Sequence, residues 1–78
     1  MRKVQIKFSA ISDIRAFVNT IGKYSADAKL KSGSYTVNAR SLMGIFALDL
    51  MKPIDLIVRG NDSVKLLDKV SQYIVCEQ

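Results

Sequence analysis

The most constraining stretch of this chain runs from Ser32 to Leu50, SGSYTVNARSLMGIFALDL. Its first part alternates polar and apolar residues up to Ala39, which is the period of a strand with one buried face. The alternation then stops, and large apolar residues cover almost the whole circumference of a short helix that starts at Ser41 and ends near residue 48. One buried face cannot absorb them all. We therefore expect part of this helix to form an exposed contact surface.

The rest of the chain repeats these two patterns. Alternation predicts four strands: residues 2–8, 27–31, 34–39 and 54–59. Apolar residues recur at three- and four-residue intervals in residues 13–24, and again in a last helix that begins after Asp62. The apolar face of that helix comprises Val64, Leu67, Val70 and Ile74, joined by Leu66 and Tyr73. The order is β-α-β-β-α-β-α. A two-layer α+β sandwich, with one antiparallel or mixed sheet and the helices on one face, is the economical arrangement.

Local signals mark the ends of these elements. Ser12 or a neighbour is suited to cap the first long helix, and Asp62 is suited to cap the last one. Ser32-Gly33 predicts a two-residue hairpin turn, because glycine accepts the positive φ that such turns require. Arg15 is expected to form a surface pair with Asp13 at the start of the first helix.

Length and composition restrict the class of protein. The 78 residues make one domain, residues 1–78, and a single cysteine cannot form an internal disulfide. No apolar run approaches the roughly 20 residues of a membrane span. We expect a cytoplasmic domain that binds no metal or cofactor. The chain contains no histidine, which excludes histidine-based acid–base catalysis, histidine metal sites and phosphohistidine chemistry.

The net charge of +5 fits either a solvated basic surface or an acidic partner. A small nucleic-acid-binding domain is one alternative that this charge suggests. The outward strand positions lack the aromatic residues that stack on RNA bases. We therefore expect neither nucleic acid nor a membrane to be the partner.

The block RSLMGIFALDL, which begins at Arg40, is similar to the K-S-I/L-M-G-V/I-M-S-L pattern of the HPr family. These proteins are the small phosphocarriers of the bacterial sugar phosphotransferase system. The resemblance extends from about Phe17 to the last helix, and it implies an open-faced sandwich with four antiparallel strands. It also implies that Ser41 is a regulatory phosphorylation site, and that the partner-binding surface comprises Arg40, Leu42, Met43 and Phe46.

One segment departs from the family pattern. The family carries its phosphoryl-accepting histidine in a G-L-H-T/A-R-P segment between the first strand and the first helix. Here that segment begins at Ser9, and a gap-free alignment places Ala10 at the histidine position. Ser12 would form a stable phosphate ester that does not pass its phosphoryl group on readily, and nothing in the sequence favours an acyl phosphate on Asp13.

These observations lead to one hypothesis with two alternatives. We expect a non-catalytic regulatory module that binds proteins of the phosphotransferase and carbon-regulation system, a serine kinase/phosphorylase among them, through the Ser41 helix. The alternatives are the basic nucleic-acid-binding domain and a phosphoryl carrier that uses a residue other than histidine. Two plainer interpretations stay open, because Ser41 can be an ordinary N-cap and part of the apolar block can pack in the core.

Overall fold

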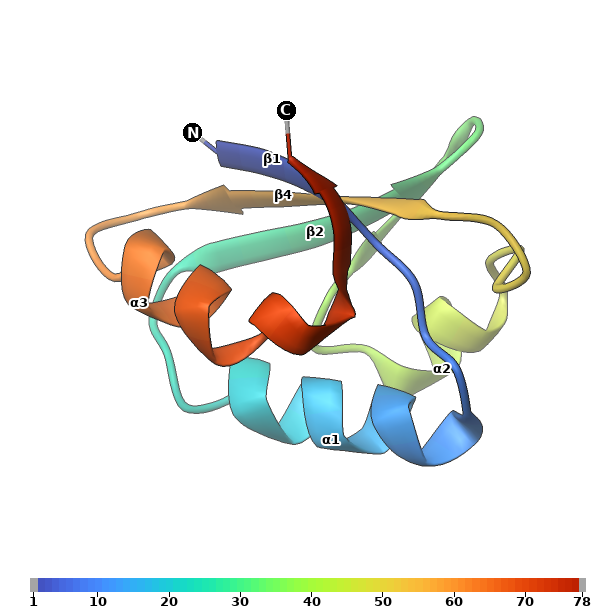
Figure 1. The fold of residues 1–78 in the computed structure, drawn as a ribbon, viewed down its shortest axis with the longest axis horizontal. Coiled ribbons are helices and arrows are strands. Elements are labelled where there is room, and N and C mark those ends of the chain that lie inside the picture. Colours follow the sequence, from blue (N-terminus) through green and yellow to red (C-terminus); the bar gives the residue numbers. More distant parts are fainter. Residues whose placement is uncertain (1, 78) are drawn as a thin grey trace.

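Five antiparallel strands and three α-helices make up the computed structural model, which describes residues 2–77. The described strands form one sheet in the order β3-β2-β4-β1-β5, and all three α-helices lie against the same face of it (Figure 1). The elements are β1 (Arg2–Ile6), α1 (Ile11–Ile21), β2 (Asp27–Ser32), β3 (Tyr35–Asn38), α2 (Leu42–Phe46), β4 (Ile54–Arg59), α3 (Ser63–Lys69), a 3₁₀ turn (Ser71–Tyr73) and β5 (Ile74–Glu77). The predicted two-layer α+β class is confirmed.

The expectation of four strands is wrong, because the chain ends in a fifth one. The last helix was expected to include Ile74, but α3 ends at Lys69 and β5 follows after the 3₁₀ turn. β5 pairs antiparallel with β1, where Ile74 opposes Ile6. The backbone N–H of Lys7 donates to the Tyr73 carbonyl at 2.9 Å, which adds a bond at the entrance of this pairing.

An aromatic cluster explains where the last helix stops. The Tyr73 ring lies 5.6 Å from that of Phe8 and 5.9 Å from that of Phe17, which in turn lie 5.2 Å apart, centroid to centroid. Pairs with this spacing and tilt contribute beyond their buried area. Tyr73 is buried there, and the chain then turns toward the edge of β1. Of the predicted apolar face of the last helix, Leu66 is buried as expected, whereas Val64 is exposed.

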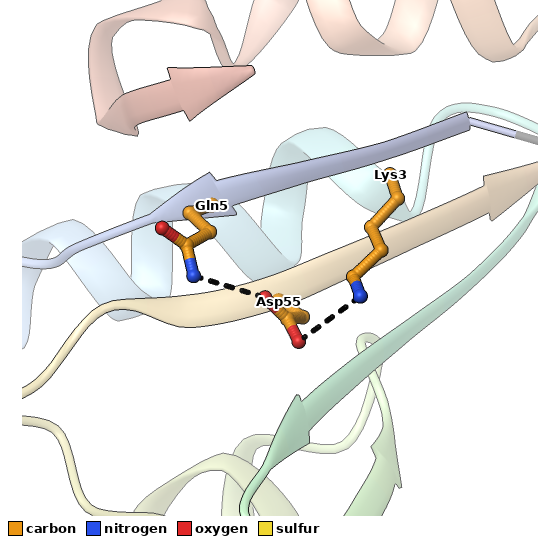
Figure 2. A network of polar contacts seen from close by, with 3 residues as sticks. All are labelled: Lys3, Gln5 and Asp55. Atoms are coloured by element: carbon orange, nitrogen blue, oxygen red, sulfur yellow. Dashed lines mark hydrogen bonds and ion pairs between the residues drawn. The ribbon is translucent and has the colours of Figure 1, made fainter. Parts of the chain in front are cut away.

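The core lies between the sheet and the helices. Alternate strand residues point into it, as the period-two pattern predicts, and they meet buried residues of α1 and α3. The largest side chains with no exposed surface include Ile6, Phe17, Ile21, Leu30, Ile54, Leu56 and Leu66. The other face of the sheet is polar. Figure 2 shows the centre of that face, where Asp55 accepts a hydrogen bond from Gln5 (3.3 Å) and pairs with Lys3 (3.6 Å).

Two expected local features shift by a residue or more. α1 begins at Ile11, so Ser12 lies inside the helix and Ala10 occupies the N-cap position. In the hairpin, Ser32 pairs with Tyr35, which leaves Gly33 and Ser34 as the two-residue loop. Gly33 has φ of 61°, the conformation for which glycine is favoured.

Asp62 precedes α3, yet its side chain does not cap that helix. Its Oδ2 instead accepts hydrogen bonds from the backbone N–H (2.9 Å) and the hydroxyl (3.2 Å) of Ser25. Asp62 therefore joins the start of α3 to the connection between α1 and β2. The backbone N–H of Ser25 is the main cause that lowers the pKa of Asp62 below its ordinary value, because it stabilises the carboxylate.

Candidate functional site

The start of α2 presents the hydroxyl of Ser41 at the surface. Ser41 is the N-cap, with extended φ and ψ of −96° and 102°, and its Oγ accepts the backbone N–H of Gly44 at 3.1 Å. The turn before it is fixed by Asn38, whose Oδ1 accepts the backbone N–H of Arg40 at 2.9 Å. The N-cap interpretation of Ser41 is thus confirmed. The residue remains exposed and open to modification.

Gly44 allows the close approach on which this cap depends. A Cβ at position 44 would lie 3.0 Å from Ser41 Oγ and 3.2 Å from Val37 Cβ, both closer than ordinary van der Waals contact. The absence of a side chain therefore lets the first turn of α2 sit directly on β3. The motif needs glycine here for space.

The guanidinium of Arg40 lies against the end of α1 and the connection that follows it. Its Nη2 donates to the backbone carbonyls of Ile21 (3.3 Å), Tyr24 and Ala26 (3.0 Å). Ile21 is the last residue of α1, and Tyr24 and Ala26 lie in the connection to β2, so Arg40 fastens this region to the start of α2. A structural role is therefore assigned to Arg40, and its contact with a partner stays a prediction.

The apolar residues of α2 divide between core and surface, as predicted for a helix that is apolar all round. Ile45 is completely buried, and Leu42 is half-buried and lines a small surface pocket together with Arg15, Val18 and Asn19 of α1. Met43 is 79% exposed and Phe46 is 41% exposed. We call Ser41, Leu42, Met43 and Phe46 the α2 face, because they present one hydroxyl beside exposed apolar side chains.

The N-terminus of α1 is closed by a carboxylate of its own first turn. Asp13 Oδ2 accepts the backbone N–H groups of Ser9 (3.1 Å) and Ala10 (3.2 Å). The carboxylate of Asp13 thus bonds to the backbone and forms no ion pair with Arg15. The prediction of a surface pair between these two residues is therefore wrong. Ala10 itself offers only a methyl group to the surface.

A shallow apolar pocket lies beside Ala10, and the sequence patterns did not reveal it. It has a volume of about 170 Å³, and α1 meets the connection between α2 and β4 there. Ile11 and Met51 line it and are 66% and 82% exposed. The sequence contains one indication of this pocket: Ile11 and Met51 are large apolar residues that lie outside the predicted apolar faces of the helices and strands.

Comparison with known proteins identifies the family. The profile described as "PTS HPr component phosphorylation site" matches residues 13–75, which is most of the chain. The chain belongs to the HPr family. The HPr-like protein Crh of Bacillus subtilis (strain 168) is 30% identical over 60 residues, which cover 74% of this chain and 71% of Crh.

Solved structures of HPr proteins have the same fold. The phosphocarrier protein HPr from Bacillus anthracis str. Ames superposes with a TM-score of 0.74 and 26% identity, covering 94% of this chain and 93% of that one. HPr-C-His from Thermoanaerobacter tengcongensis gives a TM-score of 0.80 at 24% identity, with 92% and 89% coverage. The second likeness supports the fold alone.

The HPr profile covers the region around Ser41 but not the segment around Ala10. It begins at residue 13, so it includes Ser41 and α2 but leaves out Ala10. Among the described residues, no three His, Cys, Asp or Glu side chains are grouped so that they could hold a metal ion. In the same part of the chain, none of the helices has the length and apolarity that crossing a membrane requires.

Proposed function

We propose that this HPr-family chain is a non-catalytic regulatory module that binds a protein partner through the α2 face, with phosphorylation of Ser41 as the switch. The observation that carries the proposal is the exposed Ser41 hydroxyl at the start of α2, beside the exposed Met43. Methionine suits such contacts because its flexible side chain adapts to irregular surfaces. The partner is expected among proteins of the phosphotransferase and carbon-regulation system, including a serine kinase/phosphorylase.

The local geometry supports a switch by charge. A phosphate on Ser41 would add a charge of about −1.5 to −2 at pH 7. Arg40 is the adjacent cation in the chain, but its Nη2 is bonded to three backbone carbonyls. The new charge would therefore face the solvent and a docking partner, because its sequence neighbour is already committed elsewhere.

Phosphoryl transfer through the first helix is disfavoured. Ala10 stands where the family pattern has its histidine, and a methyl group accepts no phosphoryl group. Asp13 would have to attack through a carboxylate that already accepts two backbone N–H groups, so one of its oxygens is held by the helix start. Ser12 lies in the first turn of α1, and its phosphate ester would be stable.

A nucleic-acid-binding role has weaker support. The open sheet face carries Lys3, Lys29 and Lys31, but Asp55 lies on the same face, where it engages Lys3 and Gln5 (Figure 2). This carboxylate already occupies one of the lysines and would repel a phosphate placed beside it. The outward positions of β1 and β4 also carry no aromatic side chain that could stack on a base.

The proposal is tested by incubating the chain with an HPr kinase and ATP, followed by intact-mass analysis. We expect one phosphate on the wild type and none on Ser41→Ala, with Ser12→Ala as the matched control that keeps Ser41. A parallel reaction with phosphoenolpyruvate and the general phosphotransferase enzyme should leave the mass unchanged. An unmodified wild type, or a phosphate that persists in Ser41→Ala, would remove the serine switch. A gain with phosphoenolpyruvate would restore the phosphoryl carrier.

A further inference from the structure

The open face of the sheet carries more cations than carboxylates. The helices α1, α2 and α3 all lie on the other side of the sheet (Figure 1). Alternation along β1, β2 and β4 turns a set of charged side chains toward the open face. The cations of this set are Lys3, Lys29, Lys31 and Arg59, and its carboxylates are Asp27 and Asp55.

The register of the strands places Ile57 between two lysines. Ile57 of β4 lies opposite Lys3 of β1 on one side and opposite Lys29 of β2 on the other. Opposite residues of paired strands have Cβ atoms about 4.5–5.5 Å apart, so the three side chains are neighbours. Ile57 is half-buried in a shallow hollow of about 180 Å³, which is also lined by Asp27, Lys29, Thr36 and Arg59. The open face therefore offers an apolar patch with cations on both sides of it.

Two lysines of this face are free to bind. Within residues 2–77, neither Lys29 nor Lys31 has a hydrogen bond or an ion pair through its side chain, and both are exposed. Lys31 lies opposite Asp55, but the two carboxylate oxygens of Asp55 are engaged by Gln5 and by Lys3 (Figure 2). As alternate residues of β2, the two lysines are roughly 7 Å apart along the strand.

The spacing and signs of the charges favour a polypeptide over a nucleic acid. Alternate side chains of an extended segment have the same spacing, so two glutamates in a Glu-x-Glu sequence match Lys29 and Lys31. A nucleic-acid strand carries a phosphate at every nucleotide, and some of these would lie beside Asp55 or Asp27. An apolar side chain of a protein can cover Ile57. A second copy of this chain is disfavoured, because each copy carries +5.

We infer that the open face is a second docking surface, which binds an extended acidic segment of another protein. Lys29 and Lys31 hold two alternate carboxylates of that segment, and Ile57 contacts an apolar side chain beside them. This inference goes beyond the proposed function, because the open face and α2 lie on opposite sides of the sheet (Figure 1). One chain can then hold two partners at the same time, and phosphorylation of Ser41 controls only one of them.

The test uses the ¹⁵N-labelled full chain and three cyclic β-hairpin peptides. The first presents Glu-x-Glu on one strand and a valine on the neighbouring strand, all on one face. The second replaces the two glutamates by lysines, and the third replaces the valine by serine. We expect the first peptide to shift the amide resonances of residues 29–31 and 57, with weaker binding as salt rises. The second should cause no shift, and the third should bind more weakly because it loses apolar contact.

Lys29→Gln combined with Lys31→Gln should weaken binding of the first peptide at least about ten-fold, equivalent to about 1.4 kcal/mol. The matched control combines Lys65→Gln with Lys69→Gln, which removes the same charge from exposed positions of α3. It should bind the first peptide like the wild type. Ile57→Thr keeps a β-branched side chain in the strand and should reduce the difference in affinity between the first and third peptides.

Equal shifts with the lysine peptide, no shifts with any peptide, or equal loss in the two double variants would overturn the inference. So would binding of oligothymidylate alone, or of phosphatidylglycerol vesicles alone, since the lysines would then serve a nucleic acid or a membrane. Shifts that depend on protein concentration without any peptide would show self-association and overturn it as well.

Failure of the inference is distinguishable from failure of the proposed function. Peptide shifts confined to α2, abolished by Met43→Ala and kept in the Lys29→Gln/Lys31→Gln variant, would overturn the open face while supporting the α2 face. The kinase should still phosphorylate Ser41 in that double variant, and Ser41→Ala should bind the first peptide as the wild type does. Peptide binding by the open face in a chain that no kinase modifies would support the second surface and remove the switch.

Discussion

The carboxylate of Asp13 accepts the backbone N–H of Ala10 at 3.2 Å, so the N-cap residue of α1 is bonded to an anion of the same chain. The same oxygen accepts the N–H of Ser9. Free N–H groups at a helix N-terminus ordinarily attract anions. A phosphate approaching α1 would meet a carboxylate that already holds these donors, which is consistent with a role other than phosphoryl transfer.

Asp13→Ala should destabilise the fold by about 1 kcal/mol, the usual effect of losing a helix cap. Two backbone N–H groups lose their acceptor, and the helix dipole loses a favourable charge. Asp13→Asn keeps an acceptor and should lose less. Urea unfolding followed by circular dichroism measures the difference. Asp68→Ala, at an exposed site in the last turn of α3, is the control, and an equal loss there would contradict the capping role.

Arg40→Met should lower the free energy of unfolding by about 1–3 kcal/mol, because it removes the side-chain donor to the carbonyls of Tyr24 and Ala26 in the connection after α1. Amide hydrogen exchange should accelerate over residues 22–26, where these carbonyls lie. Arg40→Lys should recover part of the loss. The exposed Arg15→Met serves as the control. If both methionine variants lose the same stability, the fastening of α1 to α2 is not the cause.

Gly44→Ala should destabilise the chain by about 1–3 kcal/mol through overpacking, although alanine is the better helix former. The new Cβ would press on Ser41 Oγ at 3.0 Å and on Val37. In a Ser41→Ala background the Oγ contact disappears, so the cost of Gly44→Ala should fall. A double-mutant cycle in urea measures this coupling. Additive losses would show that Ser41 and Gly44 do not constrain each other.

Asp62 should make stability depend on acidic pH. Its folded pKa lies below the ordinary value of 3.8, mainly because the backbone N–H of Ser25 donates to the carboxylate. Its contribution is therefore present above the unfolded pKa and is lost as pH falls through that value and then through the folded pKa. The stability difference between wild type and Asp62→Asn should shrink between pH 7 and pH 2 in urea titrations. A constant difference would exclude this linkage.

Removal of β5, by ending the chain after Tyr73, should cause self-association. The edge of β1 that Ile74 and its neighbours cover would be left with unpaired N–H and C=O groups, which readily pair with another chain. Size-exclusion chromatography with light scattering should detect concentration-dependent species. The matched control removes Gln78 alone and should remain like the wild type. A truncated chain that stays monomeric at all concentrations would contradict this role of β5.

Alternation along the sequence was sufficient to predict four of the strands, since the residues that face the core repeat with period two. The spacing of Val70, Tyr73 and Ile74 fits a helix equally well, and local spacing cannot separate the two states. The aromatic contacts of Tyr73 and the free edge of β1 decide between them. Both depend on residues far away in the sequence.

The candidate site was predictable to a similar degree. The Ser41 cap and the partial exposure of the apolar helix follow from local pattern, and both are confirmed. The inward turn of Arg40 depends on carbonyls 14 to 19 residues away, and the side chain of Asp62 on Ser25, 37 residues away. The shallow apolar pocket beside Ala10 likewise forms only when α1 and the connection after α2 meet.

The pairing of β5 with β1 has a consequence for how the chain is made. Val4, near the beginning of the sequence, pairs with Glu77, near its end. During synthesis from the N-terminus, β1 and its partner β4 are complete while the residues of β5 are still to be added. Until β5 is synthesised, the outer edge of β1 has no strand to pair with, and another segment that pairs with that edge first would compete with β5.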